Sequence, residues 1–185
     1  MTSRKQLTIV AILGAVVIAM LVGARTLLRS ELAPVGVGVD APDFSVATLD
    51  TVPKTRTLAD YRGQVVLINL WATWCAPCRV EMPAIESLHQ AYASKGLKVI
   101  AISADDPGTD ADIRKFVKQY GLTFEVLHDT GGQEGKVSKD YQTSGYPETV
   151  IIGRDGIIRK KLLGAHNWNS PENRALIERL LAEKS

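Results

Sequence analysis

The stretch NLWATWCAPCRVEMP, residues 69–83, places both cysteines of this 185-residue chain within four residues of each other. It overlaps an apolar run at residues 65–72 that has the composition of a central strand buried on both faces. Cys75 ends the loop after that strand, and a helix is predicted from Ala76 towards Ser94, with a proline in its first turn. Both thiols are therefore expected at the start of a helix that follows a central strand.

This position favours thiol chemistry. Unpaired backbone N–H groups and the positive end of the helix dipole stabilise a thiolate, so we expect the pKa of Cys75 to lie below the ~8.5 of a free thiol. Cys75 is then the attacking nucleophile. Cys78, one turn further along the helix, is expected to be more buried and to resolve the mixed disulfide. Glu81 shares that helix face and is placed to take the Cys78 proton, and burial would raise its own pKa.

A zinc site and a purely structural disulfide are less consistent with the paired cysteines. Zinc would need two more ligands, but His89, His128 and His166 are scattered singly, so no metal site is predicted and the histidines are expected on surfaces or at satisfied edges. A structural disulfide that closes so small a loop would restrain the unfolded chain little. The spacing therefore indicates a redox-active pair that itself serves as the cofactor.

The rest of the chain alternates strand and helix patterns. Helices fill the gaps between six expected strands, at residues 44–48, 65–72, 97–104, 123–128, 149–153 and 157–163. Asp155 and Gly156 form the turn of a hairpin, so the last two strands are expected to be antiparallel. Ser170 and Pro171 give the last helix a capped start. The sum is an α/β fold with a mixed sheet covered by helices on both faces.

The N-terminus differs from the rest in composition. An uninterrupted apolar run at residues 7–24 is close to the roughly 18 to 20 residues that span a bilayer, and longer than the ~7 to 15 of a signal-peptide core. Residues 1–24 are therefore predicted to be a retained membrane anchor, with a cleaved signal peptide as the alternative. Residues 25–38 are predicted to be a linker and residues 39–185 the folded domain.

The charge distribution excludes nucleic acid as a partner. The net charge is +2, but four basic residues and no acidic ones lie in the first thirty, which leaves the remainder slightly acidic. No clustered basic face interleaved with aromatic residues occurs elsewhere.

The segment INLWATWCAPCRVEMP resembles the active-site segment of the thioredoxin superfamily, and specifically of its TlpA-like and ResA-like membrane-tethered thiol:disulfide oxidoreductases. The resemblance extends from APDF at Ala41 to SGYPETVIIGRDGIIRKKLLG, which ends at Gly164. It implies a thioredoxin-like mixed sheet flanked by helices, with an N-terminal strand extension. It also implies an additional helix and strand within residues 105–129.

The resemblance implies roles for individual residues as well. Cys75, Cys78 and Glu81 match the nucleophile, the resolving cysteine and the acid near the dithiol. Pro147 matches the cis-proline that faces the pair, and the backbone of Tyr146 is then available to an extended substrate segment.

Four further positions lie in or near these motifs. Asn69 stands where many thioredoxins carry a buried Asp, and it is expected to be a hydrogen-bonded core residue. Trp71 is expected in the core, whereas Trp74 is equally consistent with packing and with substrate contact. Glu148 resembles the residue of the cytochrome c maturation branch and favours apocytochrome c as a substrate, although an acid at a strand edge is also commonly just solvated.

These observations predict an extracytoplasmic thiol:disulfide oxidoreductase that reduces disulfides in a specific protein partner. Its electrons are expected from a membrane thiol reductase, because an oxidising compartment does not keep such a pair reduced. A thiol peroxidase is one alternative, since APDF openings also occur in peroxiredoxins. It lacks local support, because Ile68 and Ala72 stand where a peroxidatic cysteine is usually preceded by Pro and by Thr or Ser. The second alternative is a non-enzymatic binding module that uses the same groove.

Overall fold

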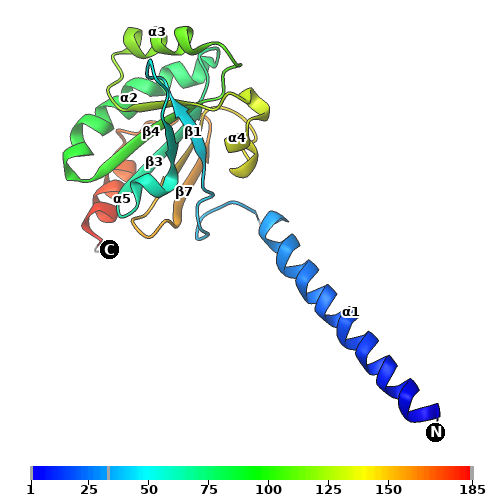
Figure 1. Cartoon of the computed structure of the whole chain (residues 1–185). Helices are drawn as coiled ribbons and strands as arrows, with labels where there is room; N and C mark the ends of the chain where they lie inside the picture. Colours follow the sequence, from blue (N-terminus) through cyan, green and yellow to red (C-terminus); the bar gives the residue numbers. More distant parts are fainter. Residues whose placement is uncertain (1, 33, 184–185) are drawn as a thin grey trace. The chain divides into compact units, whose positions relative to one another are not determined.

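The computed structural model describes residues 2–32 and 34–183 (Figure 1). The chain forms two compact units that divide between Pro34 and Val35. Four residues lie outside the described ones: residue 1 of the predicted anchor, residue 33 of the predicted linker, and residues 184–185 of the predicted domain.

A single helix, α1, extends from Thr2 to Leu32 in the region where the sequence predicts an anchor and the beginning of a linker. Among the helices of the described residues, none combines the length and the apolar character needed to cross a membrane. The later part of the predicted linker, residues 35–38, is hydrogen-bonded to the rest of the second unit. The Val35 N–H donates to Gln142 Oε1 at 3.1 Å, and the Gly38 N–H donates to the Ile158 carbonyl at 2.9 Å.

A seven-stranded mixed sheet forms the centre of the domain, in the order β2-β1-β5-β4-β3-β6-β7. Strands β3, β4 and β5 are parallel, while the pairs at both ends of the sheet are antiparallel. The bounds are β1 Ser45–Thr48, β2 Thr55–Thr57, β3 Val65–Trp71, β4 Leu97–Ser103, β5 Glu125–His128, β6 Glu148–Ile152 and β7 Ile158–Leu163. The mixed sheet and its antiparallel final pair confirm the sequence prediction, whereas β2 was not predicted.

Helices cover both faces of this sheet (Figure 1). They are α2 Ala76–Tyr92, α3 Asp110–Tyr120, α4 Lys136–Asp140 and α5 Pro171–Ala182, with short 3-10 segments at Leu58–Tyr61, Ala93–Lys95 and Gly132–Glu134. Helix α3 and strand β5 are the helix and strand expected within residues 105–129. Helix α5 begins as predicted, since Ser170 caps it by accepting from the Asn173 N–H.

Two cores result from the alternation of side chains along the strands. On one face, alternate residues of the central strands pack with α2, α3 and α5, and on the other they pack with α4 and the segment around Phe44 and Tyr61. Asn69 of β3 and Thr149 of β6 face the α2 side. Glu148, one residue earlier on β6, has the opposite direction and faces the α4 side.

Candidate active site

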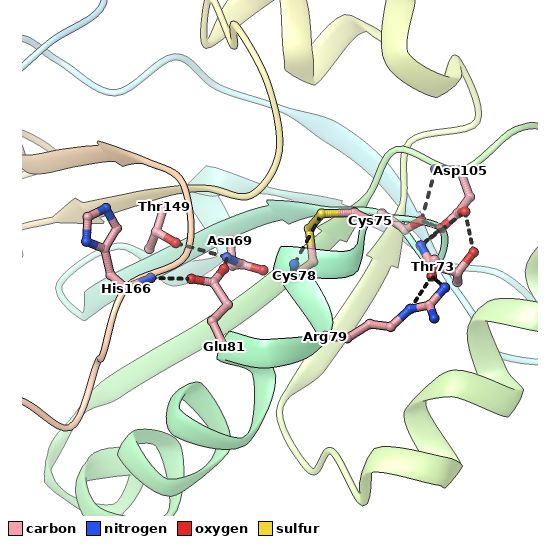
Figure 2. Close-up of a disulfide and its surroundings, with 10 residues drawn as sticks. Asn69, Thr73, Cys75, Cys78, Arg79, Glu81, Asp105, Thr149 and His166 are labelled. Carbon is pink, nitrogen blue, oxygen red and sulfur yellow. Dashed lines mark hydrogen bonds between the residues drawn. A yellow bond between two sulfur atoms is a disulfide. The ribbon is translucent and has the colours of Figure 1, made fainter.

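The two cysteines lie at the amino end of α2, as the sequence predicts. Cys75 is the N-cap of the helix, and its Sγ accepts a hydrogen bond from the Cys78 N–H at 3.2 Å (Figure 2). The two residues form a disulfide with a Cα–Cα distance of 5.3 Å. Cys78 is fully buried and Cys75 is 4% exposed, so the predicted difference in burial is present but small.

Glu81 is buried on α2 three residues after Cys78, and its carboxyl group accepts hydrogen bonds from three neutral donors. Its Oε1 accepts from Asn69 Nδ2 at 2.7 Å, while its Oε2 accepts from the His166 N–H at 3.2 Å and from Trp168 Nε1 at 3.3 Å. Burial raises the pKa of Glu81, and the hydrogen bonds offset part of that rise. The rise with burial confirms the sequence prediction. A buried carboxyl group with a raised pKa is suited to take a proton from a thiol.

Asn69 links this carboxyl group to the sheet. It is fully buried, and its Nδ2 donates to Thr149 Oγ1 at 2.9 Å as well as to Glu81. Asn69 is therefore the hydrogen-bonded core residue that the sequence predicts.

The loop before Cys75 is fixed through Thr73. The buried Asp105 carboxylate, just beyond β4, accepts from the Thr73 N–H at 2.9 Å, from Thr73 Oγ1 at 2.6 Å and from Ser103 Oγ at 2.6 Å. From the other side, the Arg79 guanidinium donates to the Thr73 carbonyl at 2.8 and 3.0 Å (Figure 2). Sequence reasoning missed this support, because Asp105 follows Thr73 by 32 residues and carries no motif of its own.

The two tryptophans of the motif have different environments. Trp71 is fully buried with its ring centroid 4.6 Å from that of Phe116, so the core prediction is confirmed. Trp74 is 51% exposed, and its ring makes an edge contact with Tyr146 at 6.0 Å. The Tyr146–Pro147 peptide bond is cis, as predicted. The contact between Trp74 and Tyr146 therefore brings the cis-proline loop beside Trp74, the residue that precedes Cys75.

Glu148 directly follows Pro147, but its side chain lies on the opposite face of the sheet from that of Glu81. It is only 4% exposed and lies on the face of the sheet away from α2, so the interpretation as a solvated strand-edge acid is wrong. The Nζ of Lys161 lies 3.6 Å from its Oε2. Burial raises the pKa of Glu148, and the charge of Lys161 acts in the opposite direction.

The histidines only partly follow the prediction. His128 is buried rather than at the surface, with Nδ1 2.6 Å from Asp110 Oδ1 and Nε2 3.0 Å from the Asp105 carbonyl. His166 reaches Glu81 through its backbone, and neither this contact nor that of Trp168 has a signal in the sequence. Both come from the loop between β7 and α5, more than eighty residues after Glu81.

Comparison with known proteins places the chain in a family. The sequence profile of the AhpC/TSA family matches residues 37–161. The thiol-disulfide oxidoreductase ResA of Bacillus thuringiensis subsp. konkukian is 38% identical over 128 residues, which cover 69% of this chain and 70% of the relative. The thioredoxin-like protein YneN of Bacillus subtilis is 42% identical over 123 residues, which cover 66% of this chain and 68% of the relative.

Solved structures agree with these relatives. A Chlorobium tepidum protein, named as a candidate thiol:disulfide interchange protein DsbE, aligns with a TM-score of 0.69 and 29% identity over 79% of this chain and 98% of its own. The chain belongs to the AhpC/TSA family and is a ResA-like thiol:disulfide oxidoreductase of the thioredoxin superfamily.

Proposed function

We propose that this protein reduces disulfides in a specific protein partner outside the cytoplasm, with Cys75 as the attacking thiol and Cys78 as the resolving thiol. The observation that carries the proposal is the buried Glu81 carboxyl group on the same helix as the Cys75–Cys78 pair. Of the two cysteines, Cys75 is the one with some exposure, and it adjoins the exposed Trp74.

The reaction has two exchange steps. The Cys75 thiolate attacks one sulfur of the partner disulfide, that S–S bond breaks, and the displaced thiolate takes a proton from solvent. Cys78 then gives its proton to ionised Glu81 and attacks the Cys75 sulfur, which breaks the mixed disulfide and releases the second partner sulfur as a thiolate that takes a proton from solvent. Two electrons pass to the partner, and this protein ends with the Cys75–Cys78 disulfide that the structure contains.

The site residues around the dithiol receive supporting roles in this proposal. Trp74 and the Tyr146–Pro147 segment contact the partner's chain, and their adjacency supports that role. Glu148 is too buried to touch a partner directly, so we assign it to the support of the cis-proline loop. The dithiol needs no further cofactor, because both electrons leave from sulfur.

A trapping experiment tests the proposal. Cys78→Ser in the full chain is expected to accumulate a mixed disulfide through Cys75 with a disulfide-containing protein, visible as a band that reductant removes. The Cys75→Ser/Cys78→Ser variant is the control and should form none. If the single variant forms no adduct with any partner, the proposed reductase activity is contradicted. Partner binding retained by the double variant, without turnover by the wild type, would indicate a binding module instead.

The direction of electron flow has its own measurement. Equilibration of the full chain with glutathione or dithiothreitol gives the reduction potential of the pair. A value near the thioredoxin range, about −270 mV, supports a reductase fed by a membrane thiol reductase. A value near −120 mV would reverse the proposed flow and make the protein a disulfide donor.

We propose apocytochrome c as the substrate and the outer side of the cell membrane as the location. The first rests on the resemblance of Pro147-Glu148-Thr149 to the cytochrome c maturation branch, and the second on the apolar run at residues 7–24 with its flanking basic residues. Faster reduction of an oxidised apocytochrome c peptide than of oxidised insulin supports the substrate. The location is supported if the full-length protein stays in a carbonate-washed membrane pellet and is cut by external protease in spheroplasts. A shortened soluble form would instead indicate that the N-terminal segment is cleaved.

A further inference from the structure

We infer that Trp168 is a positioning residue for the proton transfer by Glu81: its indole N–H, presented by the loop between β7 and α5, holds the Glu81 carboxyl group in place. This inference rests on the proposed role of Glu81 as the group that takes the Cys78 proton. It adds a residue that is remote from the cysteine motif in sequence.

The two oxygens of the Glu81 carboxyl group accept hydrogen bonds from two different parts of the fold. Oε1 is held from the sheet by Asn69 Nδ2 at 2.7 Å. Oε2 is held from the β7–α5 loop, by the His166 N–H at 3.2 Å and by Trp168 Nε1 at 3.3 Å. Trp168 is fully buried and belongs to the same core as Cys78, so its indole has a fixed position against α2.

The chemistry of the indole makes its effect directional. An indole N–H only donates, and a donor aimed at a buried carboxyl oxygen favours the ionised form over the protonated one. Burial alone favours the protonated form of Glu81, which cannot accept a proton from Cys78. The Trp168 N–H opposes that effect and therefore keeps part of the population in the base form.

The groups that face Glu81 from the neighbouring elements include few that titrate. From β3 and β6 these are Asn69 and Thr149, which do not titrate. From α2 they are Cys75 and Cys78. From the loop it is His166, whose charge lowers the pKa of Glu81 and whose ring lies 6.3 Å from that of Trp168. His166→Asn therefore serves as a control for the charge on the imidazole.

The chain offers a matched control for the loss of the indole. Trp71 is also fully buried, but its Nε1 has no hydrogen-bond partner within the described residues. Trp168→Phe and Trp71→Phe thus remove the same atoms from buried sites, and only the first removes a donor to Glu81. A purely structural role of Trp168 predicts similar effects of the two variants.

The test is the pH dependence of the resolving step, measured in single-turnover reactions of the reduced full chain with a mixed-disulfide-forming substrate such as oxidised glutathione. Trp168→Phe should shift the midpoint of the rate increase to higher pH, with a rate about fivefold lower below that midpoint and little loss above it. Trp71→Phe should leave the midpoint unchanged. In a Glu81→Gln background, Trp168→Phe should cause no further shift. An equal shift in that background, or from Trp71→Phe, would overturn the inference.

A second measurement needs no substitution of a buried tryptophan. In the oxidised wild type, the indole ¹H–¹⁵N resonance of Trp168 should titrate with the same midpoint as the carboxyl carbon of Glu81, and that of Trp71 should not. A flat Trp168 resonance across the Glu81 titration would also overturn the inference. If Glu81→Gln leaves the pH profile intact, the proposed role of Glu81 fails; if Glu81→Gln abolishes it and Trp168→Phe has no effect, only the role of Trp168 fails.

Discussion

Glu81 and Glu148 are two buried glutamates on opposite faces of the same sheet, and their surroundings differ. Burial raises the pKa of both. Glu81 accepts hydrogen bonds from three neutral donors. Glu148 has one cation, Lys161, at 3.6 Å, and its Oε2 has no hydrogen-bond partner in the described part of the chain.

The difference lies in what stabilises the ionised form of each carboxyl group. Neutral donors stabilise a carboxylate without requiring it to stay charged, so Glu81 can gain or lose a proton while its neighbours remain in place. An ion pair depends on both charges, and loss of one partner leaves the other buried and unpaired. The comparison supports the proposed roles, with Glu81 as the group that takes a proton and Glu148 as a support of the segment that follows the cis-proline.

The largest effect is expected from breaking the ion pair. Lys161→Met should lower the free energy of unfolding by about 3 kcal/mol at pH 7, because it leaves the Glu148 carboxylate buried without a cation. Lys161 Nζ also donates to the Tyr141 carbonyl at 2.6 Å, which adds to the loss. Urea unfolding measures the change. The Lys161→Met/Glu148→Gln variant should regain part of the stability, and no recovery would mean that the charge on Glu148 is not the cause.

The next effect concerns rate rather than stability. Glu81→Gln should slow the resolving step about 100-fold at neutral pH, since the amide accepts no proton from Cys78. Stopped-flow measurement of the mixed disulfide's decay gives the rate. Glu86→Gln is the matched control: Glu86 is also buried on α2, but it binds Thr123 and Gln90 instead of the site. A comparable slowing by Glu86→Gln would argue against a specific role of Glu81.

The pH dependence of stability sharpens the comparison further. A raised pKa means that the folded protein binds more protons than the unfolded chain between the usual 4.5 of a glutamate and the higher folded value. Stability is therefore expected to fall as pH rises through that window. Thermal unfolding of oxidised protein from about pH 4.5 upward should show a smaller fall in Glu81→Gln than in the wild type. The same slope in both proteins would contradict the raised pKa of Glu81.

The smallest effect tests the α2 face alone. Thr149→Val removes the hydroxyl that accepts from Asn69 and should cost about 1 kcal/mol of stability. Because Thr149 and Glu148 face opposite sides of the sheet, the carboxyl resonance of Glu148 should keep its titration midpoint, whereas that of Glu81 should move. Carbon-13 NMR of the two carboxyl groups measures both titration midpoints. A change in the midpoint of Glu148 as well as that of Glu81 would show that the two faces are coupled.

The sequence predicts those parts of the fold that depend on local pattern. The apolar run that became β3, the Asp155-Gly156 turn and the Ser170 cap each act over a few residues, and the structure contains all three. Strand β2 was missed because its three residues are polar and pair only at the edge of the sheet. Edge strands of that length leave no periodicity to detect.

The residues alone predicted the site where the chemistry is local, and the distant cis-proline Pro147 was predicted only from the resemblance to the family. Cys75, Cys78 and Glu81 lie on one helix, so spacing brings them together. Trp168 reaches Glu81 from 87 residues away, by a path that depends on how the loop after β7 returns to α2. The burial of Glu148 likewise depends on sheet order, because β6 lies between β3 and β7 and is covered on both faces.

The support of Thr73 by Asp105 and Arg79 bears on the lifetime of the covalent intermediate. With the Cys75 backbone anchored just before the helix, the Cys78 sulfur lies at a fixed short distance from any disulfide formed on Cys75. Well-oriented groups held in such a geometry reach effective molarities of about 10⁵ M and above, which far exceeds the concentration of any thiol in solution. In the proposed reaction, Cys78 therefore releases the partner before a free thiol can attack the mixed disulfide, and the partner leaves in the reduced form.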